Sequence, residues 1–384
     1  MSVEADTRTD VSNWRTPPFG RWAFHHVREV LPVADIAAGD TPRALPPSRA
    51  SLDGFSLTGR DGATLTLEQA LAATASDAMV VLKDGAVVFE AYAHGMTADT
   101  PHIWMSATKS LTGLISGLLA ADGVLDLQAP VSAYLAELAG TAYADAPLQA
   151  LIDMRAGVRL DGAQEPVYRG AAGWDPLIPG APGDLHSFFP TLPPQAVVHD
   201  GPFAYISANT DLMAWVVERA TGESFAEVVS RRLWAQMGAE HAAAITLDPS
   251  GAARAAGGMC STARDFARLG QLIVDGGVHD GRTVIPSAVL DGVAETGDAQ
   301  AWANGEWGHF FGFVGAPMCY RSGWYVVDSD PQHLFAMGIH GQNLFVDRAR
   351  RVVIAKFSSL DQPIDYPALV LTHRMADEIR RLLA

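Results

Sequence analysis

The sequence of 384 residues has 48% apolar and 18% charged residues, the composition of an ordinary globular protein with enough chain for two lobes. The formal net charge of −16 argues against nucleic acid and anionic membranes as partners, because both require a basic face on the protein. Two distant cysteines, Cys260 and Cys319, provide neither a metal-binding spacing nor a disulfide framework.

The N-terminal residues lack the basic start and apolar stretch of a secretory signal, and no apolar run is long enough to cross a bilayer. We therefore expect a cytoplasmic protein. Residues 1–20 are expected to form a flexible arm. A helix over 21–33 and a proline-rich connector over 41–47 should follow.

The next segment contains the strongest local signals. Residues 79–93 are two β-rich runs around Asp84-Gly85, a dipeptide typical of a tight turn, and predict a hairpin. An apolar helix should then run from Ser106 to Asp122, because Gly123 is a common helix terminator.

The second half of the chain mixes helices and strands. Glycine and proline crowd residues 157–194, which predicts a structured surface or pocket rim rather than a simple connector. Helical spacing covers 209–221, 225–237, 264–274, 287–293 and 366–383, and strand patterns cover 309–315, 319–327, 333–338, 343–347 and 352–358.

This order of elements predicts an α+β fold, an antiparallel sheet flanked by helices with a large helical insertion. We expect an α/β lobe made of residues 21–125 and 246–384, and a mostly helical lobe of residues 126–245. We expect a substrate-binding site at the interface between the two lobes, where such sites often lie.

Ser106 and Lys109 carry the sharpest chemical signal. Three residues are about one helical turn, so both side chains should lie on one face of the predicted helix. A serine hydroxyl needs a base to take its proton, and a desolvated lysine can act as that base. The helix from Leu111 to Leu119 is apolar nearly all round, so a spare lysine in its first turn would be unusual. The alternative is a helix N-cap beside a solvated lysine.

Tyr205, Ser207 and Asn209 precede or begin the next helix. A tyrosine beside a cation can move protons between nucleophile and leaving group, and the hydroxyl and amide could hold the lysine or the substrate carbonyl. A core tyrosine followed by a helix cap explains the same residues.

Glycines surround His340 in the late strand region, where a strand edge could present a second oxyanion donor. His340 itself is either a proton carrier facing the ligand or a core histidine.

The order of these three elements resembles the penicillin-recognising serine hydrolases, which include class C β-lactamases, D-alanyl-D-alanine peptidases and family VIII esterases. Within that family the likeness is stronger to amidases of linear aminohexanoate oligomers. It covers the chain from about residue 18 onward. The stretches that carry it are 21–24, 105–111, 207–211, 214–219, 260–265 and 339–343.

The resemblance implies that Ser106 is acylated, Lys109 is its activating base and Tyr205 is the proton shuttle. It further implies that Ser207 and Asn209 support this cluster, and that the N–H groups of Ser106 and Ile339 form the oxyanion hole. No cofactor or metal is implied.

The pocket departs from the family pattern. The Lys-Thr-Gly triplet of the β-lactamases is absent, which weighs against an efficient β-lactamase. Gln164 stands where the aminohexanoate amidases have a substrate-capping tyrosine, although Tyr168 could take that place. Ala256 replaces an asparagine before Gly257-Gly258.

The sequence therefore predicts a serine hydrolase that cleaves a small amide or ester through an acyl-Ser106 intermediate. β-Lactamase or D-Ala-D-Ala peptidase activity and a non-catalytic ligand-binding protein are the alternatives. A metallohydrolase has little support, because no ligand spacing is visible. The sequence leaves open whether the chain forms a homodimer.

Overall fold

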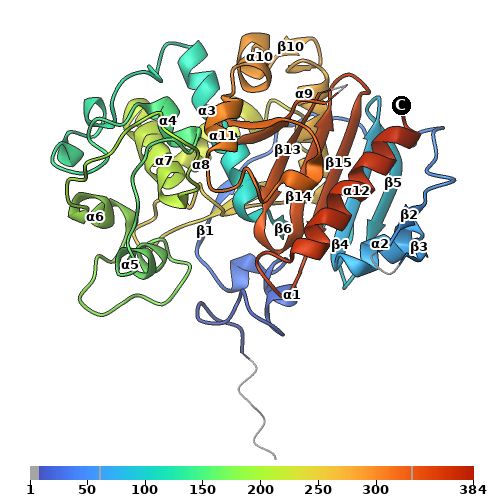
Figure 1. Ribbon diagram of the computed structural model, residues 1–384, viewed down its shortest axis with the longest axis horizontal. Coiled ribbons are helices and arrows are strands. Elements are labelled where there is room, and N and C mark those ends of the chain that lie inside the picture. The colour runs from blue at the N-terminus through green and yellow to red at the C-terminus, as the bar shows by residue number, and fades with distance from the viewer. Residues whose placement is uncertain (1–7, 60–61, 330–331) are drawn as a thin grey trace, which may run out of the picture.

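The computed structural model describes residues 8–59, 62–329 and 332–384. Its centre is an antiparallel seven-stranded sheet in the order β11-β12-β13-β14-β15-β4-β5 (Figure 1). The strands of this sheet are β4 Ser76–Lys83, β5 Ala86–Tyr92, β11 Met318–Arg321, β12 Trp324–Val327, β13 His333–Gly338, β14 Gln342–Asp347 and β15 Val352–Ser358.

Helices cover both faces of this sheet. Strand β4 shows why, because Val80 and Leu82 pack in one core cluster and Met79 and Val81 in another, on opposite faces. Helix α9 (Ala263–Val274) packs on the first face, and α12 (Tyr366–Leu382) packs on the second beside α2 (Leu67–Ala73). The predicted α+β class is confirmed.

A second sheet joins the ends of distant segments in the order β1-β7-β8-β6. Its strands are β1 Val33–Ile36, β6 His102–Ile103, β7 Ala243–Thr246 and β8 Met259–Ser261. Two short ribbons complete the strands: β2 Leu57–Thr58 with β3 Thr64–Leu65, and β9 Val278–His279 with β10 Arg282–Thr283.

Most of the remaining helices lie beside the sheet and are drawn in cyan to yellow-green in Figure 1, whereas α1 is blue and α10 and α11 are orange. The remaining helices are α1 Gly20–Ala23, α3 Thr108–Ala121, α4 Leu148–Ile152, α5 Gln164–Ala171, α6 Leu185–Phe188, α7 Ser207–Thr221, α8 Phe225–Val229, α10 Ser287–Glu295 and α11 Ala299–Ala303. Short 3₁₀ turns cover 27–29, 105–107, 131–133, 136–138, 189–191, 312–314 and 339–341, and a π-helical turn covers 230–234. The division into two lobes stays a prediction.

Several sequence expectations are confirmed. The hairpin turns at Asp84-Gly85, helix α3 ends beside Gly123, and α12 matches the predicted C-terminal helix. In the described part of the chain, none of the helices combines the length and hydropathy that crossing a membrane requires.

Three local expectations are wrong. The helix expected over 21–33 stops near Phe24, because residues after Pro32 pair as β1 with β7. Residues 309–315 form turns, in which the rings of Phe310, Phe311 and Phe313 pack against one another and Gly315 has φ 70°. The segment 319–327 is two strands, because Ser322 and Gly323 both have positive φ and make a tight hairpin turn.

The expected N-terminal arm is packed where the structure describes it, and residues 1–7 lie outside the described residues. Trp14 is buried, and its indole N–H donates to the Trp174 carbonyl at 3.1 Å. This aromatic contact fixes residues 8–20 against the body of the protein.

Candidate active site

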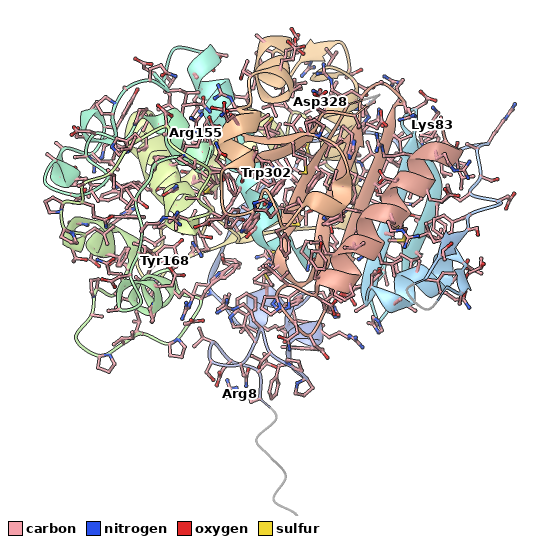
Figure 2. All side chains as sticks on the ribbon, viewed as in Figure 1. Arg8, Lys83, Arg155, Tyr168, Trp302 and Asp328 are labelled. Carbon is pink, nitrogen blue, oxygen red and sulfur yellow. The ribbon has the colours of Figure 1, made fainter. Side chains whose placement is uncertain are left out.

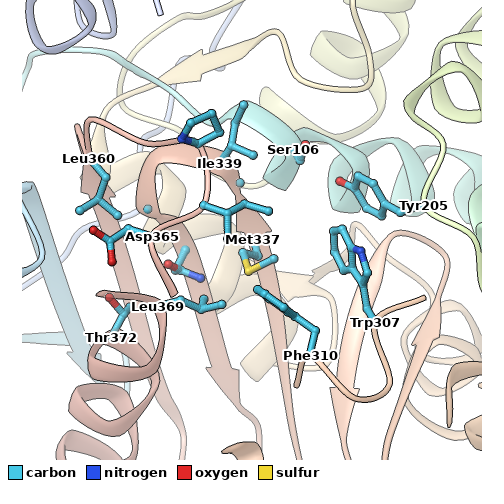
Figure 3. A pocket seen from close by; sticks show the side chains of 15 residues that line it. Ser106, Tyr205, Trp307, Phe310, Met337, Ile339, Leu360, Asp365, Leu369 and Thr372 are labelled. Carbon is cyan, nitrogen blue, oxygen red and sulfur yellow. The ribbon is translucent and has the colours of Figure 1, made fainter. Parts of the chain in front are cut away.

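Ser106 sits on a strained turn at the start of α3. Met105, just before it, has φ 49°, a conformation that a side chain other than glycine rarely adopts. The Thr108 hydroxyl stabilises this turn, because it donates to the Met105 carbonyl at 2.8 Å and accepts from the Met259 N–H at 3.1 Å. The sharp turn directs the Ser106 side chain into a cavity (Figure 3).

Lys109 lies one turn later and is 2% exposed. Its Nζ is 3.1 Å from Ser106 Oγ and 2.6 Å from the Ala256 carbonyl oxygen. Burial, and secondarily the positive charge of Arg254, holds the pKa of Lys109 well below its usual value. A lowered pKa makes the Lys109 amine easier to deprotonate, and the deprotonated amine can accept the serine proton.

Tyr205 approaches the same point from the segment before α7. Its hydroxyl hydrogen-bonds with Ser106, and its ring centroid is 4.8 Å from Lys109 Nζ. The ring stacks on Trp307 at 4.3 Å, which fixes its orientation. Burial raises the pKa of the Tyr205 phenol, so the group is protonated and can donate. The structure thus brings Ser106, Lys109 and Tyr205 together.

Gly338 brings the end of β13 against the Ser106 turn. A Cβ atom built there would lie 2.3 Å from the Trp104 carbonyl oxygen and 3.0 Å from the Ser106 nitrogen, so only glycine permits this approach. Ile339 follows directly and lines the cavity with Ser106 (Figure 3). Ser106 and Ile339 therefore lie at the same cavity, and the role of their backbone N–H groups as paired oxyanion donors stays a prediction.

Ser207 and Asn209 do not join this cluster. Ser207 begins α7, and among the hydrogen bonds of the described residues its hydroxyl makes none to Ser106 or Lys109. Asn209 is buried, and its Oδ1 accepts from the Tyr143 hydroxyl at 2.7 Å. The expectation of a supporting role is wrong for Asn209, because its amide faces the helical core.

Gln164 and Tyr168 are also absent from the lining of the cavity. Gln164 opens α5 and accepts from the Asp161 N–H at 2.9 Å, a local cap. Tyr168 is 1% exposed, and its hydroxyl donates to Asp211 Oδ2 at 2.6 Å. Neither residue lines the cavity beside Ser106, and their role in substrate binding stays a prediction from the sequence.

His340 is a core histidine. Its φ of 62° makes the tight turn between β13 and β14, and its ring packs 5.0 Å from Phe24. Its Nδ1 is 2.7 Å from the Leu360 carbonyl oxygen, and burial lowers its pKa to about 4. The side chain packs in the core beside the turn between β13 and β14, which favours the core histidine of the two sequence interpretations.

Sequence reasoning missed a buried ion pair behind Lys109. Arg254 pairs with Asp211 and contacts the Tyr168 hydroxyl. Asp211 Oδ1 accepts from the Ala256 N–H at 2.8 Å, and the Ala256 carbonyl in turn contacts Lys109. This chain of contacts holds Lys109 in place. The sequence does not reveal it, because Asp211 lies on α7 whereas Arg254 and Ala256 lie in the segment before β8, and only the fold brings them together.

The cavity beside Ser106 has a volume of about 220 Å³ and is mostly apolar. Its lining residues are Ser106, Tyr205, Trp307, Phe310, Met337, Gly338, Ile339, Gly341, Asn343, Leu360, Pro363, Ile364, Asp365, Leu369 and Thr372. Figure 2 shows the side chains of the described residues over the whole molecule. Within the described residues, the structure has no group of three or more His, Cys, Asp or Glu that could hold a metal ion.

The family model described as Beta-lactamase matches residues 65–375, and the chain belongs to this family. It is 35% identical over 361 residues to the 6-aminohexanoate-dimer hydrolase of Paenarthrobacter ureafaciens, and the match covers 92% of this chain and 88% of the relative. The protein is accordingly a serine hydrolase of the amidase and esterase type.

Two solved structures support the fold. A putative 6-aminohexanoate-dimer hydrolase from Bacillus anthracis has a TM-score of 0.87 at 28% identity, and the match covers 98% of this chain and 97% of that one. A family VIII carboxylesterase has a TM-score of 0.58 at 15% identity, covering 81% and 96%, and shows the shared fold alone.

Proposed function

We propose that the protein hydrolyses a small amide or ester by transferring its acyl group to Ser106 and then to water. The observation that supports this most directly is the meeting of three side chains from two distant segments at one cavity. Lys109 Nζ and the Tyr205 hydroxyl both contact Ser106, and the cavity admits a substrate carbonyl beside them.

In the acylation step, neutral Lys109 takes the proton of Ser106 while Oγ attacks the carbonyl carbon. The carbonyl oxygen becomes an oxyanion that accepts hydrogen bonds from the N–H groups of Ser106 and Ile339. When the bond to the leaving group breaks, Tyr205 donates its proton to that group and regains one from Lys109. Water then attacks the acyl ester and gives a proton to Lys109. Lys109 passes that proton to Ser106 Oγ as the bond from Oγ to the acyl carbon breaks, which releases the carboxylic acid and restores the Ser106 hydroxyl.

Short acyl esters are the substrates that we expect to detect first, because an ester needs less leaving-group protonation than an amide. Linear amides of the kind named for the Paenarthrobacter relative come next. β-Lactams are expected to be poor substrates, because the sequence lacks the Lys-Thr-Gly triplet whose lysine helps to bind a lactam carboxylate in the β-lactamases. A cytoplasmic location remains a prediction from the sequence, and the oligomeric state stays open.

The test is covalent labelling followed by kinetics. A fluorophosphonate should add one label to the wild-type chain and none to Ser106→Ala, as measured by intact mass. Ser116→Ala is the matched control, because Ser116 lies on the same helix and only caps the Thr112 carbonyl. With p-nitrophenyl acetate, a burst of one equivalent of nitrophenol should precede steady turnover. Full activity in Ser106→Ala would refute the proposal.

A further inference from the structure

The end of the cavity away from Ser106, called the polar end here, contains polar side chains beside Leu360 and Leu369. Figure 3 shows Ser106 and Tyr205 on one side of the cavity and Asp365 and Thr372 on the other, with Met337 between them. Asn343 also lines the cavity. A mostly apolar pocket with few polar groups generally uses those groups to orient and select its ligand.

Asn343 is the strongest indication of a ligand. It lies on β14 opposite Met337 of β13, and its side chain is 1% exposed. Its Nδ2 is buried and has no hydrogen-bond partner among the described residues. An unpaired buried amide is unfavourable, and an apolar side chain at this position would avoid that cost. A bound group that accepts from Nδ2 removes it.

Two residues of α12 complete the polar end. Asp365 caps the helix, because its Oδ1 accepts from the Ala368 N–H at 3.0 Å, and its second oxygen can accept from a ligand. Thr372 lies two helical turns later on the same face, with Leu369 between them. The polar end therefore offers an amide donor, a carboxylate acceptor and a hydroxyl.

We propose that this cavity binds an arm of the substrate that is apolar near the scissile bond and ends in a neutral hydrogen-bonding group, a hydroxyl or an amide. This proposal rests on the proposed function of Ser106. A hydroxyl or amide can accept from Asn343 and donate to Asp365 at once. A carboxylate would meet the Asp365 carboxylate, and an ammonium has no lone pair for the Asn343 amide.

The test compares esters that differ only at the end of one arm. On the acyl side, these are p-nitrophenyl hexanoate and its analogues ending in a hydroxyl, a primary amide, an ammonium or a carboxylate. On the alcohol side, they are acetate esters of hexanol and of alcohols with the same terminal groups. Two added hydrogen bonds should raise kcat/KM about tenfold for the hydroxyl or amide analogue of one series over its methyl parent.

Asn343→Leu, in which the new side chain is close to asparagine in volume, should bring the ratio of kcat/KM for the hydroxyl ester to kcat/KM for the methyl parent toward one. Thr372→Val is a second variant of nearly unchanged shape and should lower the same ratio. Asn304→Leu is the control for an exposed asparagine outside the cavity and should leave the ratio unchanged. The series in which the preference occurs identifies the side of the scissile bond that occupies the cavity.

A preference for the ammonium or carboxylate analogue in both series would overturn the proposal. The proposal would also be overturned if Asn343→Leu and Thr372→Val left the ratio of kcat/KM for the hydroxyl ester to that for its methyl parent unchanged in both series, even with all the esters hydrolysed. Failure of the proposed function is a different result, because Ser106→Ala would then retain activity on every ester.

Discussion

Adding one methyl group at Gly338 tests the paired oxyanion donors. In Gly338→Ala the new Cβ would lie 2.3 Å from the Trp104 carbonyl oxygen and 2.8 Å from Met105 Cβ. Ordinary contact begins near 3.4 Å, so β13 and the Ser106 turn must separate by about 1 Å. A displacement of that size in an active site can lower the rate about 10²-fold, which matches the loss of one oxyanion donor. We therefore expect kcat to fall about 10²- to 10³-fold.

The assay is steady-state hydrolysis of p-nitrophenyl acetate, with fluorophosphonate labelling and thermal unfolding measured in parallel. Overpacking should also lower the free energy of unfolding by about 1–3 kcal/mol, so the rate must be measured well below Tm. Gly292→Ala is the matched control, because a Cβ at that helical glycine meets nothing within 4 Å. It should be neutral or slightly stabilising. A folded Gly338→Ala variant with wild-type kcat would refute the assignment of the oxyanion donors.

Three further predictions concern the charged and titrating groups. Arg254→Met removes a positive charge near Lys109, so the pKa of Lys109 should rise and the acid limb of the kcat/KM profile should move to higher pH. Arg268→Met, which breaks another buried ion pair, is the control and should leave that acid limb in place. Tyr205→Phe should lower kcat about 10²- to 10⁴-fold for anilides and less for p-nitrophenyl esters, whose leaving group needs no proton; equal losses would contradict the shuttle role. Burial lowers the pKa of His340 from 6.5 to about 4, so the unfolded chain binds a proton before the folded one as pH falls below 6.5. The free energy of unfolding should therefore be fully retained above pH 6.5 and fall by up to about 1.4 kcal/mol per pH unit toward pH 4. Urea unfolding at pH 7 and pH 5 measures this fall, and an equal fall in wild type and His340→Asn would contradict the prediction.

The sequence predicted elements whose signals are local. The hairpin at Asp84-Gly85 depends on a tight turn between two β-rich runs, and the Ser106–Lys109 pair depends on the spacing of one helical turn. It misjudged 309–315, because a run of aromatic residues looks like a strand, whereas here the rings pack against one another within turns and Phe310 lines the cavity.

The predicted role of Tyr205 came from the order of motifs, and the fold places its hydroxyl against Ser106. The same reasoning placed Asn209 and Tyr168 at the site, where the structure buries them in the helical core. Residue type and order alone do not distinguish a side chain that faces a cavity from one that faces the core, because a small rotation of the helix decides it.

The sequence by itself determined the α+β class, the main helices and strands, and the proximity of Ser106 and Lys109 on one helical turn, since these follow from patterns within short segments. Only the tertiary structure decided which groups surround them: Arg254 and Asp211 behind Lys109, Gly338 against the Ser106 turn, and Asn343 at the far end of the cavity. Burial and charge act through space, so the pKa of Lys109 and the polarity of the pocket depend on residues that the chain brings together only when it folds.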